Sequence, residues 1–212
     1  MRTTRTNHTE VICSGGSYSF TPSNGSPLSS TVVPSGTTYS WSAPSVSGIS
    51  GTVSGTAQSS FSSGTLVNGT NAPVNVVYTL TPSYSNGGVT CSGSTFTVTV
   101  TVNPKPVIPV QAATICSGGT FTVTPANAQP TVIVPSSTTY TWTVVDNPNV
   151  TGESAQAAGV SSISQALTNN TNAVQTVVYT VTPTSGVGGN CVGSTFTVTV
   201  TVNPNPVLGS YT

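Results

Sequence analysis

The chain has 212 residues and almost no charge, with three Lys or Arg residues, three Asp or Glu residues and one His. Soluble domains average about a quarter charged residues, whereas here Thr, Ser, Asn and Gly take that place. A nearly neutral surface has little to attract nucleic acid or an anionic membrane. No apolar run is long enough for a transmembrane helix, so we expect neither nucleic-acid binding nor membrane insertion.

The chain starts with residues 1–10, which we interpret as an N-terminal arm. It contains two arginines and His8, the only histidine of the chain. No apolar stretch follows the arginines, so the arm does not have the pattern of a secretory signal.

Residues 11–104 predict a series of short β-strands separated by clusters of Gly, Pro, Ser and Asn. The clearest strand is 95–102, where Phe96, Val98, Val100 and Val102 alternate with threonines, as in a strand with one buried face. Further strands are expected at 17–21, 37–43, 65–68 and 74–81. No stretch has a convincing helical pattern.

Residues 105–110 are expected to be a linker between two domains. Three prolines occur between positions 104 and 109, and proline-rich segments are stiff and extended. The same Asn-Pro-x-Pro motif returns at 203–206. Residues 205–212 are therefore either a C-terminal tail or the start of another linker, and we expect a further unit or a neighbouring subunit to follow.

Residues 111–204 repeat the first domain. The segments 91–107 and 191–207 differ at only two of 17 positions. Strands are expected in this copy at 120–124, 138–145, 165–168, 175–182 and 195–202. A period of about a hundred residues is too long for a solenoid and matches one small domain.

Short strands at regular spacing in a unit of about 100 residues predict an all-β fold of two tandem immunoglobulin-like β-sandwiches. A Tyr-x-Trp segment fits strand C of such a sandwich, and a Val-Val-Tyr segment fits strand F. The aromatic residues that recur in both copies are expected in the cores: Tyr39, Trp41, Tyr78, Phe96, Tyr140, Trp142, Tyr179 and Phe196.

The four cysteines form one pair in each repeat. Each of Cys13, Cys91, Cys116 and Cys191 precedes a predicted strand by four residues. If the first and last strands of each sandwich run parallel side by side, the two cysteines of a repeat lie at the same end of the sheet. We therefore predict disulfides Cys13–Cys91 and Cys116–Cys191, and an oxidising location. One shared zinc ion and free buried thiols are the alternatives.

Catalytic chemistry finds little support in the sequence. His8 has no counterpart in the second repeat, and the acidic residues Asp146 and Glu153 have none in the first. Acid–base or triad catalysis needs such groups together. We therefore expect no enzyme activity, no catalytic site, no cofactor and no metal site.

The Tyr-x-Trp strand, the Val-Val-Tyr-Thr-x-Thr-Pro strand and the Cys-x-Gly-Ser-Thr-Phe-Thr-Val-Thr-Val-Thr-Val-Asn-Pro-x-Pro ending of each repeat resemble the PKD-like repeats of very large Bacteroidota surface proteins, including gliding adhesins. The resemblance covers nearly all of residues 11–207. It implies a PKD-like β-sandwich, secretion to the cell surface, many tandem copies and a fibrous or adhesive role in gliding motility or cell adhesion.

The expected function is therefore a structural or adhesive repeat module of an extracellular surface adhesin or filament. Such a module is a disulfide-stapled spacer whose expected partners are neighbouring repeats or other copies of itself. The apolar ends at 11–12 and 207–208 could let copies add end to end or donate a strand to a neighbour. The alternative is a polysaccharide-binding module that uses the loops at 45–64 and around Glu153, because these loops differ between the repeats.

Overall fold

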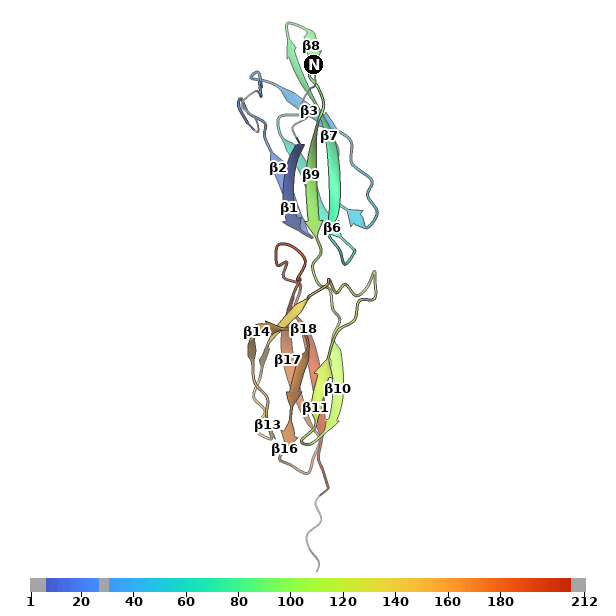
Figure 1. The fold of residues 1–212 in the computed structure, drawn as a ribbon, viewed down its shortest axis with the longest axis vertical. Coiled ribbons are helices and arrows are strands. Elements are labelled where there is room, and N and C mark those ends of the chain that lie inside the picture. Colours follow the sequence, from blue (N-terminus) through green and yellow to red (C-terminus); the bar gives the residue numbers. More distant parts are fainter. Residues whose placement is uncertain (1–6, 27–30, 207–212) are drawn as a thin grey trace, which may run out of the picture. The chain divides into compact units, whose positions relative to one another are not determined.

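A computed structural model describes residues 7–26 and 31–206, and every regular element in these ranges is a β-strand. The chain divides into two compact units, residues 1–104 and 105–212 (Figure 1). No helix in the described part is long and apolar enough to cross a membrane. The expected all-β fold of two tandem sandwiches is confirmed.

In the first unit, two sheets are built from strands with alternating buried and exposed residues. The strands are β1 (Asn7–Cys13), β2 (Gly16–Phe20), β3 (Thr38–Trp41), β4 (Ile49–Ser50), β5 (Gly55–Gln58), β6 (Phe61–Asn68), β7 (Val74–Asn86), β8 (Val89–Ser92) and β9 (Phe96–Asn103). The larger sheet has the order β1-β9-β7-β3-β5, with β8 paired to β7, and the smaller sheet has the order β2-β6-β4.

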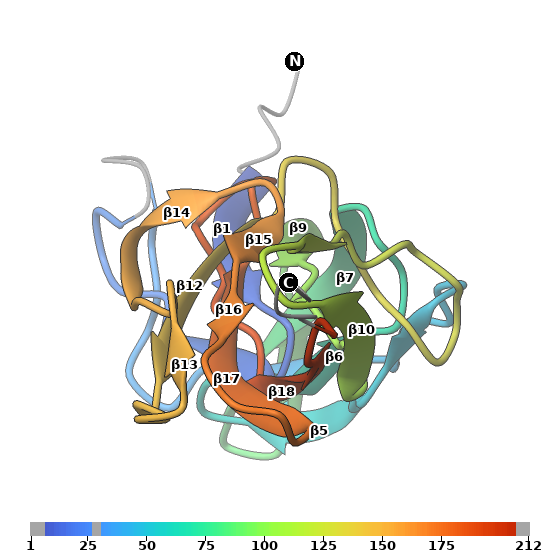
Figure 2. The same cartoon turned by 90° about the horizontal axis from the view of Figure 1, so that it is seen from below.

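The second unit repeats this plan. Its strands are β10 (Gln111–Cys116), β11 (Thr120–Val123), β12 (Thr139–Val144), β13 (Val150–Thr151), β14 (Gln156–Val160), β15 (Ile163–Ala166), β16 (Thr168–Asn169), β17 (Gln175–Thr184) and β18 (Phe196–Asn203). The larger sheet has the order β10-β18-β17-β12-β14, while β11-β15 and β13-β16 form two short pairs. Figure 2 shows β10, β18 and β17 side by side.

The period-two pattern of the last strand determines which of its faces enters the core. Val98, Val100 and Val102 of β9 are fully buried, as are Val198 and Val200 of β18. The intervening threonines lie half-buried on the other face, where the Thr101 hydroxyl donates to Asn75 Oδ1 at 2.8 Å. Because β-branched side chains suit a pleated surface with one buried face, this sequence specifies both the strand and its orientation.

The first strand of each repeat differs from the prediction. In the first repeat, the partner of the last strand is β1, which pairs parallel with β9 from Asn7↔Thr97 to Cys13↔Asn103. The segment predicted for this role, β2, pairs antiparallel with β6 in the other sheet. Residues 7–10 are thus part of the sandwich rather than of an arm, and residues 1–6 lie outside the described range.

Candidate functional site

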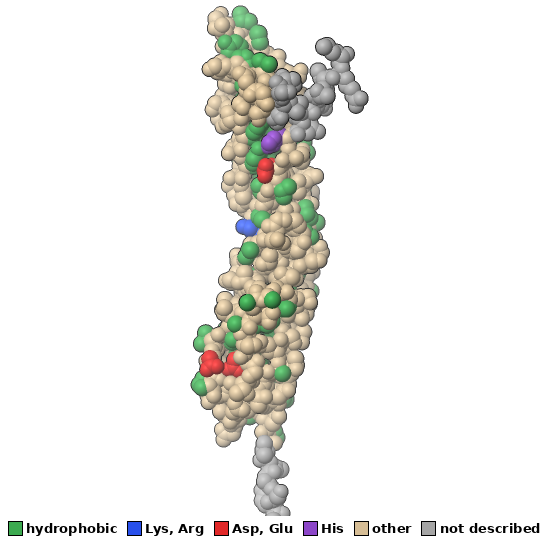
Figure 3. All heavy atoms as spheres, turned by 60° about the vertical axis from the view of Figure 1, so that its left-hand side comes forward, with side chains coloured by type: hydrophobic (Ala, Val, Ile, Leu, Met, Phe, Trp, Pro, Cys, Tyr) green, Lys and Arg blue, Asp and Glu red, His purple; other side chains and the backbone are tan. Residues whose placement is uncertain are grey.

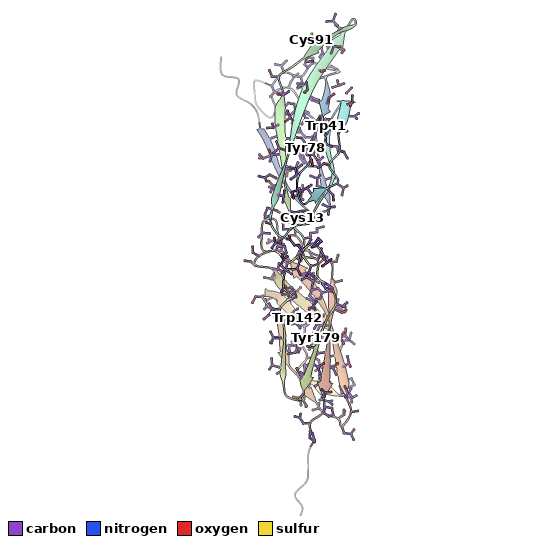
Figure 4. The ribbon with its side chains drawn as sticks, turned by 90° about the vertical axis from the view of Figure 1, so that its right-hand side faces the viewer. Cys13, Trp41, Tyr78, Cys91, Trp142 and Tyr179 are labelled. Atoms are coloured by element: carbon purple, nitrogen blue, oxygen red, sulfur yellow. The ribbon has the colours of Figure 1, made fainter. Side chains whose placement is uncertain are left out.

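The cysteines do not form the two predicted bridges. Cys91 and Cys116 have free, exposed thiols, whereas Cys13 and Cys191 are disulfide-bonded. The pairing Cys13–Cys91 is wrong because Cys13 ends β1 opposite Asn103, at the far end of β9 from Cys91. The eight residues of β9 alone span more than about 20 Å, and Figure 4 shows the two cysteines at opposite ends of the first repeat.

The same geometry rules out Cys116–Cys191. Cys116 ends β10 opposite Asn203, whereas Cys191 precedes the first residue of β18. The prediction failed because it took the strand that follows each first cysteine, rather than the strand that precedes it, as the neighbour of the last strand.

The recurring aromatic residues lie in the two cores. Seven of the eight are buried, and Phe96 is half-buried and packs against the same cluster. Burial raises the pKa of Tyr78 to about 12 and also raises the pKa of Tyr179, where the nearby Glu153 charge adds to the effect. These rings therefore stabilise the sandwiches and are not accessible as a sugar-stacking platform.

The loops that differ between the repeats are attached to the cores by the tryptophans. The indole N–H of Trp41 donates to the carbonyl of Val53, and that of Trp142 donates to the carbonyl of Ser154, each at 3.0 Å. The backbone N–H of Asn147 donates to Glu153 Oε1 at 3.1 Å. Glu153 is thus part of a loop-fixing contact, which explains why an acid occurs there.

Ionisable side chains are sparse in the described part of the chain, as Figure 3 shows on one face. His8 stacks on Phe20 with ring centroids 4.5 Å apart and hydrogen-bonds the hydroxyl of Tyr18. It therefore has a packing role at the edge of the first sandwich. No group of three His, Cys, Asp or Glu side chains gathers among residues 7–26 and 31–206.

Both repeats join their first and last strands in parallel. The β1–β9 ladder has seven residue pairs, and the β10–β18 ladder has six. Each repeat is entered at the start of its first strand and left at the end of its last strand. These two points lie at opposite ends of the ladder, so tension applied along the chain shears all its hydrogen bonds together.

In the second repeat, residues ahead of β10 pack over one end of the sandwich. This is the end at which the chain passes from β17 to β18. Residues 105–110, which the sequence indicates as a linker, belong to this repeat. The backbones of Val107 and Ile133 exchange two hydrogen bonds of 2.9 Å. Ile108 is 8% exposed and joins the core. We call residues 106–108 the connector plug.

Gly193 shows how tightly the connector plug fits. A Cβ atom added to this glycine would lie 2.3 Å from the carbonyl oxygen of Pro106. No side chain fits at such a distance, so glycine is required by the close approach of the plug backbone.

The equivalent place in the first repeat is an open groove of about 340 Å³. Its lining includes Val32, Tyr39, Cys91 and Gly93, which correspond to Ile133, Tyr140, Cys191 and Gly193 of the second repeat. Val32 is 81% exposed, whereas Ile133 is 5% exposed. We call this place the end groove. Figure 3 shows apolar side chains gathered at this β8 end of the repeat.

One residue that lines the end groove has a buried polar atom without a partner. Tyr39 is 2% exposed, and its hydroxyl has no hydrogen-bond partner among the described residues. Burial raises the pKa of Tyr39, so the hydroxyl is a neutral donor at ordinary pH. Buried hydroxyls nearly always find a partner, so Tyr39 is an exception in the first repeat. Sequence reasoning missed this site, although the Asn-Pro-x-Pro repetition was a signal for it.

Comparison with protein families decides the kind of domain. A family model described as a PKD-like domain matches residues 10–106 and again residues 113–206. The chain belongs to the PKD-like domain family. PKD-like and immunoglobulin-like repeats are typically non-catalytic and commonly serve as structural or adhesive modules, usually of extracellular proteins.

Solved structures with immunoglobulin-like and cadherin folds are similar to this PKD-like chain at low identity. The I-band fragment I67–I69 of titin is 10% identical, with a TM-score of 0.34, and the match covers 94% of this chain and 63% of the fragment. Drosophila N-cadherin EC1–4 is 8% identical, with a TM-score of 0.36 and coverage of 94% and 49%. Human mucin-like protocadherin EC1–2 is 15% identical, with a TM-score of 0.31 and coverage of 95% and 98%.

The chain thus spans less than two thirds of the titin and N-cadherin fragments it matches. A comparison with curated protein sequences finds no match.

Proposed function

We propose that this chain is a load-bearing repeat module of an extracellular filament or surface adhesin. The observation that carries the proposal is the parallel pairing of first and last strands in both repeats. A module loaded in shear must lose six or seven residue pairs in one step. A module loaded at one end of a ladder would lose them one at a time at lower force.

An extracellular location is supported by chemistry and by family. Cys13 and Cys191 are disulfide-bonded, and disulfides persist in oxidising compartments. The PKD-like fold is typical of extracellular arrays, and the resemblance to large Bacteroidota surface proteins agrees with this location. A surface rich in Thr and Ser with little charge also favours contact between neighbouring modules over electrostatic repulsion.

Single-molecule force spectroscopy on the full chain, held at its two ends, tests the load-bearing role. With the disulfide of Cys13 and Cys191 reduced, so that the load passes through the whole backbone, we expect two unfolding events at similar high force, one for each repeat. Ala113→Pro in β10 removes a backbone donor from the β10–β18 ladder. It should lower the unfolding force of one event only.

Ala158→Pro is the matched control, because it lies in β14, at the edge of the sheet away from the loaded ladder. It should leave both unfolding forces near those of the unmodified chain even if thermal stability falls. Two low-force events in the unmodified chain would contradict the proposal, as would equal effects of the two proline variants.

A further inference from the structure

The two repeats differ in whether the end of the sandwich is covered. In the second repeat, Val107 pairs with Ile133 and Ile108 fills the core edge. In the first repeat, the corresponding end groove is open among the described residues, and Val32 faces solvent. Gly93 is the counterpart of Gly193 and is also a glycine. A Cβ atom added to Gly93 would contact no plug residue and only Pro82, at 3.0 Å. The end groove therefore has the shape of a plug site without its plug.

The sequence offers one other segment of the plug type. The connector plug is the Pro-Val-Ile of an Asn-Pro-Lys-Pro-Val-Ile sequence at 103–108, and the chain continues after β18 as Asn-Pro-Asn-Pro-Val-Leu at 203–208. Pro206 is exposed, whereas Pro106 is buried. We call residues 206–208 the tail plug; residues 207 and 208 lie outside the described range and enter only by their sequence.

The residues ahead of β1 do not match the plug. The connector plug stands 10 to 8 residues before Cys116 in the sequence. The residues at the same distance before Cys13 are Thr3, Thr4 and Arg5. These residues offer neither the proline nor the two apolar side chains of the connector plug. Arg5 in the place of Ile108 would bring an unpaired charge to an apolar site, which is costly.

We propose that the end groove of one copy of this chain binds the tail plug of a second copy, so that copies add head to tail. Val207 of the incoming tail pairs with the backbone of Val32, as Val107 does with Ile133, and Leu208 takes the place of Ile108. Because each copy has one groove and one tail, the contact is heterologous and extends into a filament. The inference rests on the proposed function, since it supplies the junction through which load would pass.

The free cysteines fit the same junction. Cys91 lines the end groove, and Cys116 lies opposite Asn203, at the base of the tail. Asn205 holds the tail base by donating its side-chain N–H to the carbonyl of Ser117 at 2.8 Å. The three residues from Asn203 to Pro206 span at most about 10 Å. A docked tail therefore brings Cys116 within reach of Cys91 of the next copy, and their counterparts Cys13 and Cys191 are disulfide-bonded.

A disulfide between these thiols would lock the junction. Oxidised glutathione is a suitable oxidant: one thiolate attacks its disulfide and releases one glutathione, and the second thiolate then displaces the other glutathione. The Cys91–Cys116 bond forms, two S–H bonds are lost, and the glutathione disulfide is reduced to two thiols.

The first test uses the full chain in a glutathione redox buffer over a range of concentrations. Sedimentation and electron microscopy are expected to show head-to-tail multimers. Non-reducing electrophoresis should show a ladder, and mass spectrometry should find Cys91 joined to Cys116. A chain that stays monomeric at the highest concentration would overturn the proposal, as would Cys91–Cys91 and Cys116–Cys116 links in proportions expected of random pairing.

The second test separates the groove from the tail. Val32→Asp places a carboxylate in the groove, and Leu208→Asp places one in the tail plug, at the position of the buried Ile108. Each variant alone should reduce assembly by about tenfold or more, because docking would bury an unpaired charge. An equimolar mixture should form dimers and no larger species, since the intact tail of the Val32→Asp chain fits the intact groove of the Leu208→Asp chain.

Val145→Asp is the matched control, because Val145 is 82% exposed, as Val32 is 81% exposed, and lies outside the groove. It should assemble as the unmodified chain does. Assembly that survives both groove and tail variants would overturn the proposal. A chain that stays monomeric but unfolds at high force would refute the groove contact and leave the load-bearing role in place. A chain that assembles but unfolds at low force would refute the load-bearing role and leave the groove contact in place.

Discussion

The two repeats have the same last strand and the same recurring aromatic residues, yet they complete their sandwiches differently. The second repeat uses the connector plug, with Val107 paired to Ile133 and Ile108 in the core. The first repeat leaves Val32 exposed beside the end groove. The comparison teaches that the residues ahead of the first strand decide whether the end of the sandwich is covered: residues 106–108 cover it ahead of β10, and the described residues of the first repeat leave it open.

The cores differ in a compensating way. Phe61 in β6 of the first repeat corresponds to the smaller Ile163 in β15. Across from them, the half-buried Tyr18 corresponds to the buried Phe121, whose ring lies 5.3 Å from that of Tyr179. One repeat thus places its large ring on β6 and the other on β11, which keeps the core filled. Volume-conserving exchanges of this kind are the best tolerated in cores.

The largest expected effect tests what the repeats share. Asn68 and Asn169 are buried and make equivalent hydrogen bonds; Asn68 donates to the carbonyls of Ala72 and Val102 and accepts from Thr70. Replacing either Asn by Ala removes a donor from the buried carbonyl of Val102 or Val202 and the acceptor of the Thr70 or Thr171 backbone N–H, at about 1–3 kcal/mol for each group. We expect Asn68→Ala and Asn169→Ala each to destabilise its own repeat by roughly 3 kcal/mol.

The free energy of unfolding of each repeat can be measured by urea unfolding, with hydrogen exchange followed separately on peptides from each repeat. The exposed Asn205→Ala is the control and should cost less than about 0.5 kcal/mol. A large loss in one repeat and none in the other would show that the shared hydrogen bonds do not stabilise the two sandwiches alike.

The next prediction isolates the connector plug. Gly193→Ala places a Cβ atom 2.3 Å from the Pro106 carbonyl, whereas Gly93→Ala meets only Pro82, at 3.0 Å. Overpacking of this kind typically costs about 1–3 kcal/mol. We therefore expect Gly193→Ala to lower the stability of its repeat by about 2 kcal/mol and to expose the Val107 amide to exchange. Gly93→Ala is the matched control with a much smaller effect; equal losses would mean that the plug does not explain the glycine.

A smaller difference is expected from the two core tyrosines. Tyr78 donates to the backbone carbonyl of Ser63 at 2.7 Å, and Tyr179 donates to the side chain of Gln165 at 2.9 Å. Gln165 Oε1 also accepts from the Ser154 backbone, at 3.2 Å, so it keeps a partner when the tyrosine hydroxyl is removed. Tyr78→Phe should cost about 1.5 kcal/mol and Tyr179→Phe about 0.5 kcal/mol. The reverse order in thermal melts of the two variants would contradict this assignment.

The smallest effect concerns alkaline pH. The pKa of Tyr78 is raised from 10.0 to about 12 by burial, and the pKa of Tyr179 is raised by burial and by Glu153. A tyrosine whose pKa is higher in the folded than in the unfolded state contributes stability that is fully present below the unfolded pKa. This stability is lost as pH rises from 10 towards 12. Stability should therefore fall above pH 10 in both repeats. Glu153→Gln should lower the pKa of Tyr179 and leave that of Tyr78 unchanged, as followed by tyrosinate absorbance; a shift in both would contradict the local origin.

The sequence predicted the architecture because its strongest strand is strictly periodic. Residues 95–102 were expected to form a strand, and the structure has β9 at Phe96–Asn103. It did not predict β1, because Asn7–Cys13 has His8, Glu10 and two polar residues in a strand whose faces are only partly buried. The two wrong cysteine pairings followed from missing β1 and its counterpart β10.

The end groove could not be predicted for a different reason. Three prolines in residues 104–109 indicate an extended segment, but proline content alone does not say what an extended segment touches. The connector plug is held by two backbone hydrogen bonds and by the burial of Ile108, and both depend on the distant Ile133 segment. Only the matching Asn-Pro-x-Pro-Val sequence at 203–207 was visible beforehand as a sign of a repeated contact.

Amide hydrogen exchange at Val32 and Ile133, measured in dilute and in concentrated protein, tests the central claim most directly. The Ile133 amide donates to Val107 at 2.9 Å, so it should be protected at every concentration. The Val32 amide should exchange freely in dilute monomer and become protected as copies assemble. Protection of Val32 already in the monomer would show that the chain covers its own groove, and free exchange in the assembled state would show that the groove is not the junction.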